Sequence, residues 1–272
     1  MTKHGGTIDW RLGTMGFGYA EWSGGVFYPD GVKAGDFLQH YAHHFDAVEL
    51  DTTFYATPPV DRVQKWAEAT PPDFRFAAKA PKAVTHDTSI DRAVEAMVDF
   101  LSVMTRGLGQ KLGVVLLQFP PSFTGRETPK LERFLRALPN EVELAAEFRH
   151  DSWWAAADAT AQLLRSYRVA WAAAEYVAEP RTIVPTTDLA YVRLIGEHHR
   201  FKNMNTVEID VTAKLRWWRD HLTALDPAPK QAWVLFNNDF SGFAIETARQ
   251  FRKMLDLPDP EPPPLPADGL FA

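Results

Sequence analysis

Charged side chains recur at the ends of short apolar segments of this chain. Glu49 and Asp51 end one such segment, and Glu147 and Arg149 end another. A pair of carboxylates can transfer protons or attack a substrate, and an adjacent arginine can hold a phosphate or another anion. The spacing therefore predicts acid–base chemistry on an anionic substrate at these segment ends.

The candidate residues divide by the chemistry that their side chains allow. The candidates for catalysis are carboxylates and histidines: Glu49, Glu147, His150, His86 and Asp239. The candidates for substrate binding carry charges, amides, hydroxyls or aromatic rings: Asp51, Tyr55, Lys79, Gln118, Arg149, Trp153, Arg193, Asn237, Asn238 and Ser241. A histidine beside a carboxylate can exchange protons near neutral pH. An indole can stack on a sugar or base, although it more often packs at the start of a helix.

Other kinds of site fit these residues less well. A metallohydrolase would need ligands such as Glu49, Asp51, Glu147, His150 and Asp239, but the nearby lysine and arginines would compete with a cation. We therefore expect no cofactor and do not favour a divalent metal. A two-carboxylate glycosidase would use Glu49 and Glu147, whereas barrel glycosidases commonly place their carboxylates after strands four and seven.

A purely structural interpretation competes with all of these sites. Glu49, Glu147, Lys79, Arg149 and Arg193 include both signs of charge, so they could form ion pairs that fill the top of a barrel. Buried charges are costly unless they are paired, which makes such a network an expensive filler. The pocket and the network both stay open at this point.

Alternating strands and helices must position these residues. Periodicity predicts eight strands, at 8–13, 46–51, 74–79, 113–119, 143–149, 169–174, 189–195 and 232–237. Helix-period segments lie between most of them, at 34–44, 60–68, 90–106, 128–138, 153–166, 211–224 and 242–255. This order predicts an α/β fold, a (β/α)8 TIM barrel, that is slightly irregular between strands six and seven, where Pro180 and Pro185 disfavour a helix. An open doubly wound sheet is disfavoured because residues 13–18 do not match the dinucleotide-binding fingerprint.

Alternation within each strand predicts which side chains point into the barrel. If Val48 and Leu50 pack on helices, Glu49 and Asp51 point inward. The same phase in the other strands directs a further set to the carboxyl ends of the strands: Lys79, Gln118, Glu147, Arg149, Arg193 and Asn237. That end is the mouth of the barrel, where ligands bind in this fold.

The composition bounds the compartment and the partners. The 272 residues carry a net charge of -6 and no cysteine, which argues against broad attraction to nucleic acid or membranes and excludes disulfides. A local basic cleft for nucleic acid stays open. Residues 1–6 lack the apolar stretch of a signal peptide, and no apolar run approaches the ~20 residues of a membrane span. We expect a cytoplasmic protein that binds a small anionic or phosphorylated ligand and no membrane.

The domain organisation is expected to be simple. Residues 1–257 should form one barrel domain, and the proline-rich residues 258–272 should form an extended tail. Residues 268–271 read Asp-Gly-Leu-Phe and resemble a bacterial sliding-clamp-binding peptide without its usual glutamine. A barrel recruited through this tail to a protein or to nucleic acid is therefore an alternative to an enzyme.

A set of motifs occurs in order along the chain. The motifs are Gly13-Thr14 with Phe27-Tyr28-Pro29, Val48-Glu49-Leu50-Asp51 with Phe54-Tyr55, Lys79 with Thr85-His86, residues 117–123, Glu147-Phe148-Arg149-His150 with Trp153, and Phe236-Asn237-Asn238-Asp239. From about residue 10 to residue 255 the chain resembles the DUF72 family, which includes the YecE-like proteins. The resemblance implies a TIM barrel of unestablished activity. A likeness in shape to endonuclease IV barrels adds a metal-dependent nuclease as a further alternative.

Two positions depart from the pattern of that family. Met15 stands where a small serine is common, and Ile195 stands where relatives usually carry histidine. If that histidine is catalytic in the relatives, this chain is altered there or uses His198 or His199 instead.

The leading hypothesis is an enzyme of the hydrolase or lyase type that acts on a phosphate-bearing or other anionic substrate. Glu147 or Glu49 would be the general base, and His150 or His86 would be the acid. A clamp of cations would hold the anion, namely Arg149, Arg193 and Lys79.

Overall fold

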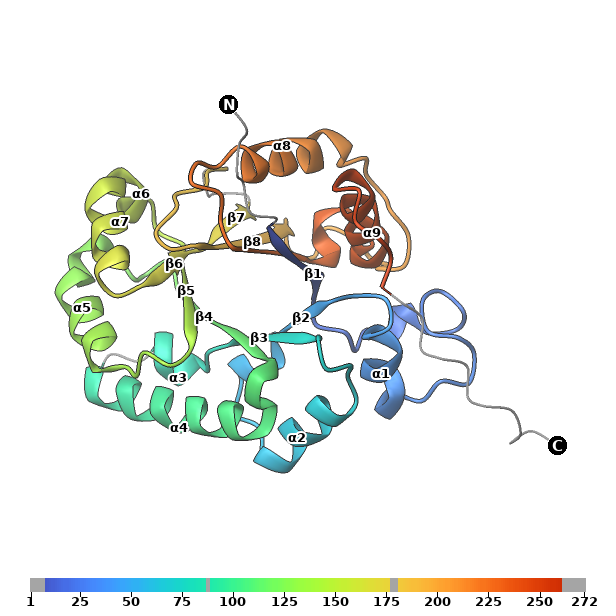
Figure 1. Cartoon of the computed structure of the whole chain (residues 1–272), viewed down its shortest axis with the longest axis horizontal. Helices are drawn as coiled ribbons and strands as arrows, with labels where there is room; N and C mark the ends of the chain where they lie inside the picture. The colour runs from blue at the N-terminus through green and yellow to red at the C-terminus, as the bar shows by residue number, and fades with distance from the viewer. Residues whose placement is uncertain (1–7, 87–88, 177–180, 261–272) are drawn as a thin grey trace.

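The computed structural model describes residues 8–86, 89–176 and 181–260. Parallel strands surround a central axis, and helices cover them on the outside (Figure 1). The strands are β1 Asp9–Met15, β2 Ala47–Leu50, β3 Arg75–Lys79, β4 Leu112–Phe119, β5 Glu143–Phe148, β6 Val169–Trp171, β7 Ala173–Tyr176, β8 Leu189–Gly196 and β9 Gln231–Phe236. Their order in the sheet is β6-β5-β4-β3-β2-β1-β9-β8-β7. The chain forms the predicted TIM-type barrel.

The barrel closes within one predicted strand. The expected strand 169–174 is divided at Ala172 into β6 and β7, because its first half pairs with β5 and its second half pairs with β8. The two ends of the nine-strand order are therefore one residue apart in the chain. The Ala172 amide still donates to the Ala146 carbonyl, at 2.9 Å, so the wall is continuous across the break.

The helices follow the predicted segments with local differences. They are α1 Phe37–Tyr41, α2 Val60–Glu68, α3 Lys82–Thr85, α4 Ile90–Leu108, α5 Thr128–Ala137, α6 Asp151–Ala155, α7 Ala157–Ser166, α8 Thr212–Thr223 and α9 Ala244–Met254. The expected helix 34–44 is shorter, and the expected helix 153–166 is interrupted at Ala156, whose φ and ψ of -111° and 40° are not helical. The short helix α3 had no periodic signal. In the described ranges, no helix is both long and apolar enough to cross a bilayer.

The predicted phase of the strands is confirmed by two separate apolar clusters. Val48, Leu50 and Phe148 belong to the outer cluster between strands and helices. The inner cluster contains many small side chains, among them Ala47, Ala77 and Ala145, and a few large ones such as Tyr191 and Trp233. Apolar side chains therefore fill the middle of the interior, between Asp9, Arg11 and Gln231 at the amino ends of the strands and the charged residues at the carboxyl ends.

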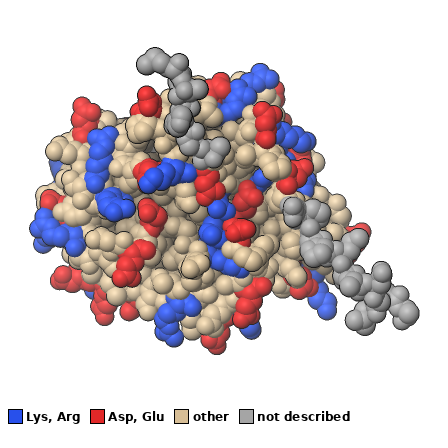
Figure 2. All heavy atoms as spheres, in the orientation of Figure 1, with Lys and Arg blue, Asp and Glu red and all other residues tan. Residues whose placement is uncertain are grey.

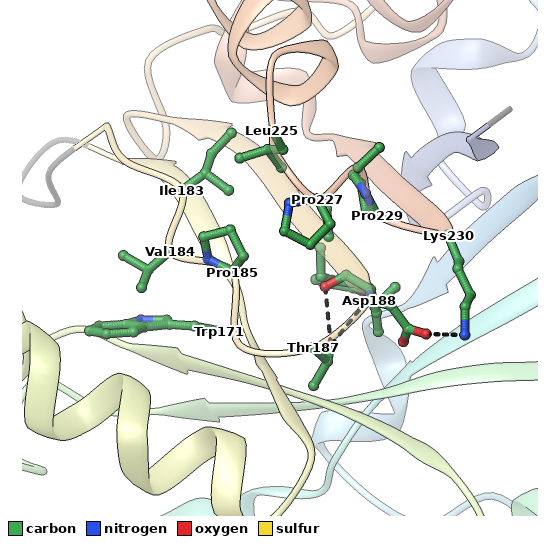
Figure 3. Close-up of a pocket in the computed structure, with 14 residues that line it drawn as sticks. Trp171, Ile183, Val184, Pro185, Thr187, Asp188, Leu225, Pro227, Pro229 and Lys230 are labelled. Carbon is green, nitrogen blue, oxygen red and sulfur yellow. Dashed lines mark hydrogen bonds and ion pairs between the residues drawn. The ribbon is translucent and has the colours of Figure 1, made fainter. Parts of the chain in front are cut away.

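The predicted irregularity lies between β7 and β8. Residues 181–188 form no helix, and the Thr186 hydroxyl occupies the edge of β6 instead, accepting from Trp171 N at 2.8 Å and donating to Val169 O at 2.7 Å. A cavity of about 290 Å³ lies beside this segment (Figure 3). The cavity reaches Asp188 and Lys230, which precede β8 and β9, so it lies toward the amino ends of the strands and away from the mouth.

Candidate functional site

Arg193 is the centre of a buried network at the mouth of the barrel. Its Nε and Nη2 donate to the two carboxylate oxygens of Glu49, at 3.0 and 2.7 Å. Its Nη1 donates to Glu147 Oε2 at 2.6 Å. The three side chains come from β8, β2 and β5, and all three residues are buried. The arginine therefore connects three separate parts of the wall through charge-assisted hydrogen bonds.

Three further side chains complete this network. The Tyr191 hydroxyl donates to Glu49 Oε2 at 2.8 Å, and Met15 Sδ accepts from Arg193 Nη2 at 3.5 Å. Arg149 Nη2 forms an ion pair with Glu147 Oε1 at 2.5 Å, although the geometry of this contact is not that of a hydrogen bond. The Arg149 guanidinium also lies over the Tyr176 ring, 4.2 Å from its centroid. The structural interpretation named five charged residues as a possible ion-pair network, and four of them are paired with one another: Glu49, Glu147, Arg149 and Arg193.

The electrostatics of the network oppose a role for Glu147 as a general base. Burial would raise the pKa of the Glu147 carboxyl, but Arg149 and Arg193 outweigh burial and lower that pKa well below its ordinary value. Burial opposes the charge of Arg193, whereas Glu147 and Glu49 raise the pKa of this guanidinium. A carboxylate held by two guanidiniums has few lone pairs left for a substrate proton. Glu147 therefore positions Arg193 and Arg149.

Lys79 is the fifth charged residue and stands apart from the network. Its Nζ lies 4.2 Å from the centroid of the Phe54 ring, and in the part of the chain that the structure describes it forms no hydrogen bond or ion pair. Burial, then the Arg193 charge, lowers the pKa of Lys79 to about 8, although Glu49 and Glu147 partly offset this effect. The mouth therefore holds an amine that is easily deprotonated and has no fixed counterion.

Two carboxylates at the mouth lie outside the network. Burial, then the charge of Glu49, raises the pKa of Asp51. Asp239 is buried, and its Oδ1 finds no hydrogen-bond partner within the described ranges, while its Oδ2 lies 3.3 Å from His198 Nδ1. Asp51 and Asp239 both act on the Tyr19 hydroxyl, whose pKa is raised by burial first and by these charges next. Asp51 and Asp239 are the mouth carboxylates with spare proton-accepting capacity.

The loop that carries Asp239 depends on Gly196, the last residue of β8. A Cβ on Gly196 would lie 2.2 Å from the Asp239 carbonyl oxygen, and its φ of +78° also favours glycine. Asn237 Oδ1 accepts from Asp239 N at 2.9 Å, and Asn238 Oδ1 accepts from Ala244 N, at the start of α9. The two predicted amides therefore shape this loop.

Several predicted site residues lie away from the mouth or have their side chains buried in packing. Ser241 is fully buried and bonded to Thr247 in α9. Trp153 is buried in the outer core, donates to Phe123 O at 2.8 Å and stacks on Phe148 with centroids 4.3 Å apart. Tyr55 is 84% exposed at an outer groove beside α4. Burial and side-chain packing, which single-residue spacing does not reveal, decide these positions.

The two predicted histidines and Gln118 have mainly local partners. His150 caps α6, and its Nδ1 accepts from Ser152 N at 3.1 Å. His86 Nδ1 lies 2.8 Å from Thr85 Oγ1, and its ring contacts Phe54 with centroids 5.2 Å apart. Burial, then the Lys79 charge, lowers the pKa of His86. Gln118 Nε2 donates to the adjacent Phe119 carbonyl. His86 is thus near Lys79, whereas His150 has a capping role.

Tyr19, Phe54 and Tyr176 are part of the site but were not predicted. Phe54 and Tyr176 cover the Lys79 and Arg149 cations, and Tyr19 donates to Met15 O at 2.6 Å. Extending the alternation of the sixth strand by two residues would have placed Tyr176 at the mouth. Phe54 belongs to one of the motifs of the family resemblance but was not assigned to the site, and no pattern in the sequence marks Tyr19.

The alternatives that involve metals or large partners gain no support from the described residues. Within them, no three His, Asp or Glu side chains are grouped so that they could hold a metal ion. Residues 268–271 and Asp87 lie outside the described ranges, as do most of the predicted tail and Pro180. On the face seen in Figure 2, Lys and Arg are interspersed with Asp and Glu, which is not the broad basic surface that a nucleic-acid backbone attracts.

The chain is similar to proteins of one family. The model described as "Protein of unknown function DUF72" matches residues 11–269. UPF0759 protein YecE of Escherichia coli strain K12 is 37% identical over 139 residues, and this match spans about half of each protein, 51% of this chain and 49% of YecE. UPF0759 protein YunF of Bacillus subtilis strain 168 is 29% identical over 255 residues, 85% of this chain and 90% of YunF.

Solved structures of the family share the fold. A DUF72 family protein from Enterococcus faecalis V583 has a TM-score of 0.74 at 22% identity, covering 93% of this chain and 99% of the other. One from Thermotoga maritima MSB8 has a TM-score of 0.73 at 29% identity, covering 91% and 99%. The barrel is therefore shared at low sequence identity.

Proposed function

The chain belongs to the DUF72 family, whose function is unknown, and we propose that the barrel mouth is the active site of an enzyme of the hydrolase or lyase type. Its substrate is a small molecule with an anionic group. The observation that carries this proposal is the Lys79 amine, a half-buried cation with no hydrogen bond or ion pair among residues 8–86, 89–176 and 181–260. A cation kept without a partner at the ligand-binding end of a barrel is best explained by a ligand that supplies the negative charge.

In the sheet order, Lys79 and Arg149 lie across the mouth from Asp239. Lys79 ends β3 and Arg149 follows β5, with β4 and Gln118 between them. Asp239 follows β9, across the barrel from this side, and lies beside His198. The anionic group of a substrate would bind at the Lys79 and Arg149 side, where it avoids repulsion by Asp239.

This arrangement changes the catalytic roles expected from sequence. Glu49 and Glu147 are occupied by Arg193 and hold the site together. Asp51, whose pKa is raised by burial first and Glu49 next, is the better proton donor. Asp239 with His198 supplies an acid–base pair on the opposite side, whereas His150 caps α6.

Ligand titration of two matched lysine variants tests the proposal. Inorganic phosphate, sugar phosphates and small carboxylic acids are titrated by calorimetry against wild type, Lys79→Met and Lys82→Met. Lys82 is exposed three residues away and provides the control. Loss of a charge-assisted contact should weaken binding by about 10- to 100-fold in Lys79→Met alone. Equal affinity in all three proteins, or no binding by wild type, would contradict the proposal.

A further inference from the structure

Lys79 has the surroundings of a nucleophile as well as those of a binding group. Its side chain follows Ala77 into the barrel interior and ends against the face of Phe54. Glu49 and Glu147, two strand carboxylates that interact electrostatically with Lys79, already bind Arg193. No carboxylate among the described residues therefore holds the amine in its charged form through direct contact.

Neutral amine is present at ordinary pH. Burial and the guanidiniums of Arg193 and Arg149 lower the pKa of Lys79 to about 8 against the ordinary value of 10.5. At pH 7 about a tenth of such an amine is unprotonated, compared with less than about a thousandth of an exposed lysine. Desolvation and neighbouring cations are the conditions that activate lysines for covalent catalysis.

We propose that Lys79 forms an imine with a substrate that carries a ketone or aldehyde as well as an anionic group. This inference rests on the proposed function for the anionic group, which Arg149 would bind. The Nζ lone pair attacks the carbonyl carbon and forms the C–N bond, while the carbonyl electron pair moves to oxygen. A proton then passes from the nitrogen to this oxygen, and the resulting hydroxyl leaves as water with a second proton from Asp51, which gives the protonated imine. No oxidant or reductant is consumed.

Asp51 and His86 follow neighbouring elements, interact electrostatically with Lys79 and suit this reaction sequence. Asp51 follows β2, which pairs with β3, and the two charges interact. His86 follows α3 and interacts electrostatically with Lys79. The imine thereby places a positive nitrogen beside acid–base groups, which is the arrangement required for cleaving or deprotonating the bond next to the former carbonyl.

Borohydride trapping tests this inference. The full chain is incubated with pyruvate or dihydroxyacetone phosphate at pH 7.5, reduced with sodium borohydride, and mapped by peptide mass spectrometry. Reduction of the imine leaves a stable secondary amine on the lysine. We expect at least about tenfold more adduct on Lys79 than on Lys82, because the lower pKa gives far more neutral amine. Adduct spread evenly over the exposed lysines would overturn the inference.

Lys79→Arg separates this inference from the proposed function. Arginine keeps the cation for an anionic group but cannot form an imine. Retained phosphate binding with complete loss of the adduct supports both. If wild type binds phosphate but gives no Lys79 adduct with either carbonyl probe, the imine is refuted and the anion site stands. If wild type neither binds phosphate nor forms the adduct, both fail. Lys79→Met, checked for folding by circular dichroism, should lose both properties.

Discussion

Replacing Arg193 by methionine should destabilise the barrel through the charges that it leaves behind. Glu49 and Glu147 would stay buried, and Glu49 would keep only the Tyr191 hydroxyl as a partner in the network. Removing one partner of a buried ion pair costs ~3–5 kcal/mol, far more than a surface pair contributes. For a chain of this size that corresponds to a fall in Tm of roughly 6–10 °C.

The pH dependence identifies the cause of this loss. In the wild type the pKa of Glu147 is lowered despite its burial, because Arg149 and Arg193 outweigh desolvation. Its stabilising contribution is therefore complete above the ordinary value of 4.5 and is lost as pH falls through the folded pKa. In Arg193→Met the Glu147 carboxylate keeps only Arg149 and takes up a proton more readily, so the difference between the variant and the wild type should shrink between pH 7 and pH 4.

Urea unfolding at pH 7 and pH 4 measures both effects. Arg136→Met removes the exposed, i to i+4 partner of Glu132 and is the matched control, expected to stay near wild type. Adding Glu49→Gln to Arg193→Met should recover at least ~1 kcal/mol, because one buried charge is removed. A loss below ~1 kcal/mol at pH 7, or an equal loss at both pH values, would refute the assignment of this network as a buried, mutually compensated unit.

Three further predictions concern single residues. The rate of reductive methylation of Lys79 should rise with pH, with a midpoint near pH 8, and a midpoint near 10.5 would contradict the buried amine. Lys79→Met should stabilise the fold below pH 8, and this gain should disappear by pH 10.5. Gly196→Ala should lower the free energy of unfolding by more than ~1 kcal/mol in thermal unfolding. The loss should exceed that of Gly24→Ala, because Gly24 has a similar φ of +69° but open space where a Cβ would lie. Equal losses would mean that contact with Asp239 is unimportant. Trp153→Ala should lower the free energy of unfolding by ~3–5 kcal/mol in urea without weakening phosphate binding. Weaker phosphate binding by a folded variant would show that Trp153 belongs to the site.

Strand phase explains why the central part of the candidate site could be predicted from the sequence. Because side chains alternate along a strand, placing Val48 and Leu50 outside places Glu49 inside, and the same argument applies to Glu147 and Arg193. The convergence of these charges then follows from the parallel order of strands. The barrel itself follows from eight predicted strands, most of them separated by helix-period segments.

The division of roles among those charges could not be predicted in this way. Side-chain reach decides that Arg193 contacts both glutamates while Lys79 contacts neither, and a pattern of residue types carries no information about reach. Loop residues were harder still. His150 and Ser241 are polar and follow strands, yet their hydrogen bonds serve the first turns of helices, because exposed backbone N–H groups there need acceptors.

The absence of a helix in residues 181–188, the described part of the connection between β7 and β8, has a consequence for local opening of the barrel. Helix α7 packs on β6, but the edge of β6 beside this segment is held by the Thr186 hydroxyl and by a cavity wall that includes Ile183, Val184 and Pro185. Few backbone hydrogen bonds must break to lift this segment, so opening there should require less free energy than global unfolding. In native-state hydrogen exchange, the Trp171 amide should therefore exchange first. The amides around Ala172, the seam at which β6 and β7 close the barrel, should follow. Exchange of this amide only by global unfolding would show that the seam is as stable as the helix-covered strands.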